Sequence, residues 1–123
     1  MSPHPNQVLD EEALQRLRDL DPSGQSRLLG RVMRAFESSV ARLGPQLREA
    51  RLRDDTTAIR HVAHTLKSSS ASIGAMRLSR LCAEIESAVR QEALAGMAAL
   101  LDDMDRELAV VLQAVQPMRD MQE

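Results

Sequence analysis

Apolar residues recur along the chain at steps of three and four positions, which is the spacing of an amphipathic α-helix. The first series begins after Asp10, an N-cap type of residue, and the two glutamates that follow it suit a first helical turn. Leu14, Leu17 and Leu20 are expected to anchor this short helix. The Asp-Pro-Ser-Gly segment at 21–24 then predicts a turn.

A longer apolar series follows, and it keeps its phase across Gly44 and Pro45. A proline inside a helix removes a hydrogen bond and kinks or breaks the helix. The segment is therefore either one long helix kinked at the proline or two helices in succession. We favour the single helix because the apolar stripe stays in register. Its members are Leu29, Val32, Phe36, Val40, Leu43 and Leu47.

Three further helices are predicted. The first begins near the N-cap candidates at 54–56 and ends at Gly74, a residue that suits a left-handed C-cap. The last contains Gly96, which weakens it slightly, and is expected to stop at Pro117. The three stripes are Ile59, Val62, Leu66, Ser69 or Ser70 and Ile73; Leu78, Leu81, Cys82, Ile85 and Val89; and Leu94, Met97, Leu101, Met104, Leu108, Val111 and Val115.

Long amphipathic helices joined by short links predict an all-α fold: an antiparallel up-down four-helix bundle with a short additional N-terminal helix at one end. The expected organisation is a flexible lead-in at 1–8, a bundle domain at 9–116 and a tail at 117–123. Composition agrees, because 43% of the 123 residues are apolar while Phe36 is the only aromatic residue. The core must therefore be aliphatic, without the aromatic and β-branched runs typical of strands.

Charge and cysteine content narrow the function classes. The formal net charge of -2 argues against a general nucleic-acid binder. Cys82 is the only cysteine, so no internal disulfide is possible, which suits a reducing compartment. No apolar run approaches the roughly 20 residues of a membrane span, and residues 1–7 lack a signal-peptide pattern. We expect a cytoplasmic protein or module without membrane or nucleic-acid partners.

The placement of His64 is the most informative feature of the third predicted helix. On a wheel with about 100° per residue, its apolar stripe centres near 30° when Val62 is set at zero. His64 then falls at about 200°, almost opposite the core. The histidine is therefore expected in the middle of the outward face.

The neighbours of His64 on that face are small or cationic. Ser68 and Ala71 follow at the next turns, while Arg60 and Lys67 lie beside the histidine. Small residues allow a second protein to approach closely, and cations suit a transferred anion. A neutral imidazole nitrogen can attack phosphorus, and phosphoryl transfer depends mainly on positioning and charge stabilisation. The sequence lacks both a P-loop and a kinase-type glycine loop, so it predicts a phosphoryl carrier without ATP-dependent kinase activity.

The segment 63–75, Ala-His-Thr-Leu-Lys-Ser-Ser-Ser-Ala-Ser-Ile-Gly-Ala, closely resembles the signature of histidine-containing phosphotransfer (HPt) domains, and the resemblance extends over roughly residues 8–115. It implies that His64 accepts a phosphoryl group from a receiver-domain aspartate and passes it to another receiver in a two-component phosphorelay. The implied partners are receiver domains of a hybrid sensor histidine kinase, a response regulator or both. No cofactor of its own is implied, since the receivers would supply the magnesium.

The resemblance also implies roles for individual residues. Lys67 matches the lysine near the phosphoryl group, and Gly74 matches the glycine at the helix end. Ser68 stands where glycine is commonest, and because serine is still small, docking is expected to survive with altered partner preference. Arg90 matches a basic position of some members. The expected docking residues are Arg60, Ser68, Ala71, Gly74 and Arg77.

Four other interpretations of the sequence stand beside this one. His61 and His64 form an H-x-x-H pair, but two ligands without carboxylate or thiol support make a weak metal site, so none is predicted. Arg77 and Arg80 are either solvated charges or contacts for an acidic receiver surface. The alternative function is a helical adaptor that binds a receiver without phosphorylation. A dimerising kinase histidine domain is disfavoured by Thr65, where an acidic residue would be expected, and by the lack of a following proline.

Overall fold

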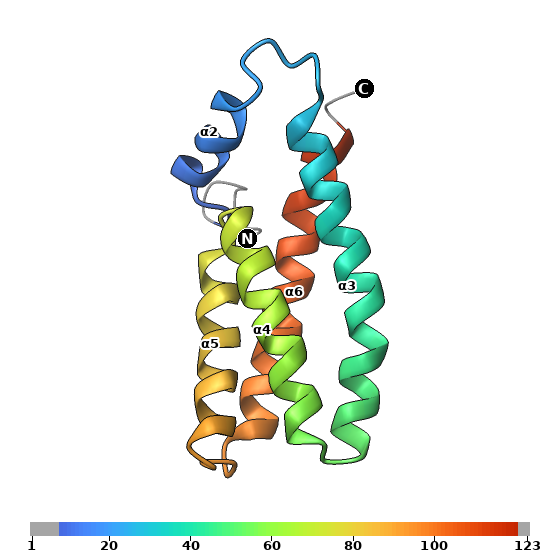
Figure 1. Cartoon of the computed structure of the whole chain (residues 1–123), viewed down its shortest axis with the longest axis vertical. Helices are drawn as coiled ribbons and strands as arrows, with labels where there is room; N and C mark the ends of the chain where they lie inside the picture. The colour runs from blue at the N-terminus through green and yellow to red at the C-terminus, as the bar shows by residue number, and fades with distance from the viewer. Residues whose placement is uncertain (1–7, 121–123) are drawn as a thin grey trace.

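The structure is a computed structural model that describes residues 8–120 (Figure 1). All regular elements in this range are helices, which confirms the predicted all-α class. Residues 28–52 form one helix with Pro45 inside it, so the single-helix interpretation is also confirmed. The elements are α2 (Glu11–Asp19), α3 (Leu28–Leu52), α4 (Thr56–Ser72), α5 (Met76–Arg90) and α6 (Met97–Asp120).

The four long helices pack around a shared aliphatic core. Each of them contacts two others, in the pairs α3–α4, α4–α5, α5–α6 and α3–α6. Figure 1 shows that consecutive helices run in opposite directions, with α2 at the end where α4 gives way to α5. The core is built from Leu, Ile, Val, Met and Ala side chains, together with Phe36 and Cys82. None of the helices in residues 8–120 combines the length and apolarity needed to cross a membrane.

The short turn between α4 and α5 is fixed by Gly74. Its φ of +82° is left-handed, and the backbone bonds from Gly74 N–H to Ala71 and from Ala75 N–H to Ser70 close a Schellman cap. The backbone N–H of Asp10 donates to the Gly74 carbonyl at 2.7 Å. A Cβ at position 74 would lie 2.8 Å from the Asp10 nitrogen, so the start of α2 packs directly onto this glycine.

Both predicted helix starts that rest on aspartate N-caps are confirmed. The Asp10 carboxylate accepts the Ala13 N–H at 3.2 Å, and the Asp55 carboxylate accepts the Ala58 N–H at 3.1 Å. These contacts satisfy backbone donors that have no partner inside the first turn. Asp55 therefore sets where α4 begins and, with it, the position of His64 along that helix.

Among the predicted anchors of the apolar stripes that lie outside the helices, Ile73 is buried, whereas Leu20 and Leu94 are exposed. Leu20 follows the last residue of α2 and is 75% exposed, and Leu94 precedes α6 and is 44% exposed. Gly96 likewise precedes α6 and does not weaken it from within. Both leucines keep the helical spacing although they lie in the links between helices, so the periodic pattern continues beyond the real helix ends.

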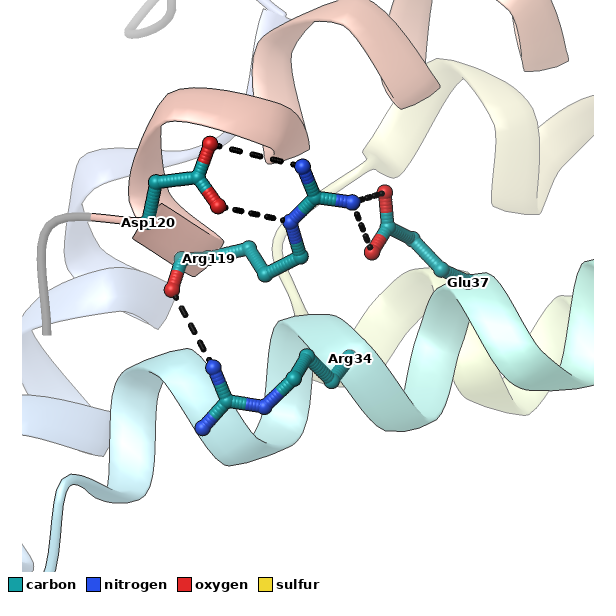
Figure 2. Close-up of polar contacts among 4 residues, drawn as sticks. All are labelled: Arg34, Glu37, Arg119 and Asp120. Carbon is teal, nitrogen blue, oxygen red and sulfur yellow. Dashed lines mark hydrogen bonds and ion pairs between the residues drawn. The ribbon is translucent and has the colours of Figure 1, made fainter. Parts of the chain in front are cut away.

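The prediction that Pro117 stops the last helix is wrong, because α6 continues to Asp120. Figure 2 shows the contacts that hold this final turn against α3. Arg119 Nη1 lies 3.1 Å from both carboxylate oxygens of Glu37, and Arg34 donates to the Arg119 carbonyl at 3.3 Å. Residues 117–120 are thus part of the packed helix, while the rest of the predicted tail lies outside the described residues.

Candidate functional site

His64 lies on α4 with its ring directed outward, as the wheel predicts. Its side chain is 64% exposed, whereas Val62 and Leu66 on the opposite side of the helix are buried. The imidazole is therefore accessible to a second protein. The same helix places Arg60, Ser68 and Ala71 on the exposed surface near it.

A buried carboxylate on α5 holds the imidazole. Glu86 Oε2 lies 3.0 Å from His64 Nδ1, and Glu86 Oε1 lies 2.6 Å from Lys67 Nζ. The Glu86 side chain is only 8% exposed, whereas Lys67 is 37% exposed. One carboxylate thus joins the two residues that the sequence singled out on α4, and it fixes how the ring is turned.

The charge state of Glu86 decides which tautomer of His64 is present. Burial raises the pKa of Glu86, but the hydrogen bonds and positive charges of Lys67 and His64 together lower it below its usual value. An ionised carboxylate can only accept hydrogen bonds, so His64 Nδ1 must carry the proton. In the neutral ring the lone pair then resides on Nε2, at the edge of the imidazole away from Glu86.

The α4–α5 contact is also fixed at the turn that carries Lys67. Ser79 Oγ donates to the Lys67 carbonyl at 3.1 Å, which ties the two helices together beside the Glu86 contacts. Cys82 lies one turn before Glu86 and is fully buried. Burial, and next the negative charge of Glu86, raise the pKa of the Cys82 thiol to about 12, so it stays protonated and takes no part in the chemistry.

Two comparisons with known proteins agree with this geometry. The family model described as "Hpt domain" matches residues 31–116. The chain belongs to the Hpt domain family. Among solved structures, histidine-containing phosphotransfer protein B (HptB) from Pseudomonas aeruginosa PAO1 is similar, with 30% identity and a TM-score of 0.80. The match covers 93% of this chain and 96% of that one. A search of curated proteins found no match.

Hpt domains are phosphotransfer carriers of two-component phosphorelays and act with receiver domains rather than as kinases. The matched range begins inside α3 and includes His64, Lys67 and Glu86. It does not include α2, which packs on the end of the domain through Gly74. Membership therefore supports a histidine phosphotransfer role for the site on α4 and α5.

Of the predicted docking residues of this Hpt domain, Gly74 is buried and Arg77 is exposed. Gly74 is buried under the first turn of α2, where it has a structural role. Arg77 is exposed and forms an ion pair of 3.2 Å with Glu107 on α6. Arg90, the weakest candidate, is the exposed last residue of α5. Docking itself remains a prediction for Arg60, Ser68, Ala71 and Arg77.

Glu86 is the residue of this site that the sequence pattern did not single out. A signal was present, since Glu86 lies four residues after Cys82 and is thus in phase with the buried stripe of α5. A carboxylate at a buried position needs a positively charged or hydrogen-bonding partner. Within residues 8–120 no cluster of three or more His, Cys, Asp or Glu side chains suits a metal ion.

Proposed function

We propose that His64 accepts a phosphoryl group on Nε2 from the aspartyl phosphate of one receiver domain and passes it to the aspartate of a second receiver. In this proposal the four long helices act as an antiparallel up-down four-helix bundle, a rigid support for the exchange. We expect the exchange to take place in the cytoplasm, with magnesium bound by the receivers and no cofactor on this chain.

The observation that supports the proposal best is the Glu86 contact at 3.0 Å to His64 Nδ1. The neutral ring attacks phosphorus with the Nε2 lone pair, a nitrogen–phosphorus bond forms, and the bond from phosphorus to the aspartate oxygen breaks. The electron pair of that bond leaves with the aspartate as a carboxylate. The ring gains positive charge and retains its Nδ1 proton, which Glu86 continues to accept. The second transfer reverses these steps with another aspartate.

Lys67 is a positioning residue in this proposal, because its ammonium lies 2.6 Å from Glu86 Oε1. Its positive charge keeps the buried Glu86 ionised, and an ionised Glu86 keeps the proton on Nδ1. Replacing Lys67 with Ala is expected to slow transfer without unfolding the domain, because the side chain is partly exposed.

The decisive experiment incubates the chain with a radiolabelled, phosphorylated receiver domain. We expect acid-labile and base-stable label on the wild type and no label on His64→Gln, whose helical content should match that of the wild type. Label that persists on His64→Gln would refute the assignment. A stable complex with the receiver and no label on the wild type would instead support the adaptor function.

A further inference from the structure

An open cleft of about 490 Å³ lies beside His64, towards the N-terminal end of α4. It follows the helix from the N-cap Asp55 to His64, a rise of about 13 Å at 1.5 Å per residue. Glu86 closes it from α5. The other residues along it are Thr57, Ala58, Arg60 and His61. The side chains at 57 and 58 are short, which leaves space at the end of the cleft near the start of α4.

Lys67 is not placed to neutralise a group in this cleft. Its ammonium is paired with Glu86, and Glu86 is bound at the Nδ1 edge of the ring. Moving Lys67 away would leave one oxygen of a buried carboxylate without its partner, which is costly. The positive charge of Lys67 is therefore already balanced by Glu86.

Arg60 is the cation that the cleft itself offers. It lies four residues before His64, so the two side chains are neighbours on one helix face. The ion pairs found within residues 8–120 do not include Arg60. The acidic residue at the far end, Asp55, already accepts the Ala58 N–H as the cap of α4. A guanidinium group binds phosphate oxygens through directed, charge-assisted hydrogen bonds.

We propose that this cleft receives the phosphoryl group carried on His64 Nε2, and that Arg60 is the side chain that binds it directly. Lys67 then acts only through Glu86. This inference rests on the proposed function in taking His64 as the phosphorylated residue, but it does not depend on any receiver domain. It assigns Arg60, expected from the sequence only to contact a partner, a direct contact with the transferred group.

The test phosphorylates the chain without a partner. Phosphoramidate transfers its phosphoryl group to the imidazole nitrogen, and its nitrogen leaves as ammonia. The phosphohistidine is then followed by ³¹P NMR across a pH series in the wild type and in Arg60→Ala, Arg60→Lys and Lys67→Ala. Arg42→Ala is the matched control, because Arg42 is an exposed arginine on α3 that does not line the cleft. Circular dichroism verifies that each variant is folded.

A cation in contact with the phosphoryl group favours its dianion, so loss of that cation moves the ³¹P titration midpoint to higher pH. For Arg60→Ala we expect a shift of the midpoint equivalent to about a three- to tenfold change in proton affinity. Arg60→Lys should show a smaller shift, and the midpoint of Arg42→Ala should equal that of the wild type. A shift in Lys67→Ala as large as that in Arg60→Ala, or no shift in Arg60→Ala, would overturn the inference. Failure of receivers to label His64 would overturn the relay and leave this result standing.

Discussion

Replacing Gly74 with alanine is expected to destabilise the domain while leaving the chemistry of His64 intact. The backbone at Gly74 is left-handed, with φ at +82°, and a side chain pays for that conformation with about 1–2 kcal/mol. The added Cβ would also meet the Asp10 nitrogen at 2.8 Å and the Asp10 oxygen at 2.9 Å. Since these are backbone atoms, the start of α2 has to move.

That movement breaks the 2.7 Å hydrogen bond from Asp10 N–H to the Gly74 carbonyl. Loss of one such bond costs about 0.5–1.5 kcal/mol. Together with the backbone strain, Gly74→Ala should lower the free energy of unfolding by about 1.5–3.5 kcal/mol. Urea unfolding followed by far-UV circular dichroism measures this difference, provided that the domain unfolds in one cooperative transition.

Gly24→Ala is the matched control, because Gly24 also has a positive φ, of +74°, but no atom lies within 4 Å of its Cβ position. The free energy of unfolding of Gly24→Ala should fall only by the cost of the backbone strain, about 1–2 kcal/mol. If Gly74→Ala costs no more than Gly24→Ala, the close packing of α2 on the α4–α5 turn is refuted. A loss of phosphotransfer in folded Gly74→Ala, with no loss of stability, would instead restore the docking role first expected for Gly74.

Two further predictions concern the carboxylate and the thiol at the α4–α5 contact. The folded-state pKa of Glu86 is lowered, so the stability it contributes is present above the ordinary value of 4.5 and is lost as the pH falls through the lower folded value. The free energy of unfolding of the wild type, measured with urea, should therefore fall more steeply below pH 4.5 than that of Glu86→Gln. If the two free energies fall in parallel with pH, the contact of ionised Glu86 with His64 and Lys67 is contradicted. Cys82, with its pKa near 12, should resist alkylation at mildly alkaline pH until urea is added. Rapid labelling of the native protein would show that this thiol is not buried.

Local pattern was sufficient for much of the fold. The steps of three and four along the chain predicted the helices, and Asp10, Asp55 and Gly74 predicted where individual helices begin or end. The same periodicity placed His64 opposite the apolar stripe of its own helix, and the structure confirms that exposure. These features depend on residues within one or two turns of each other, so the amino-acid order alone determines them.

Contacts between different helices could not be predicted from these local patterns. Glu86 meets His64 across 22 positions of sequence, and Arg119 meets Glu37 across 82. Such pairs depend on how far one helix slides and rotates against another, which periodicity leaves open. The sequence by itself determined the helices and an outward histidine. Only the tertiary structure decided that the buried Glu86 carboxylate binds the His64 ring, that α6 continues beyond Pro117 and that Arg77 pairs with Glu107 on α6. The reason is that the packing of the helices against one another determines which side chains meet.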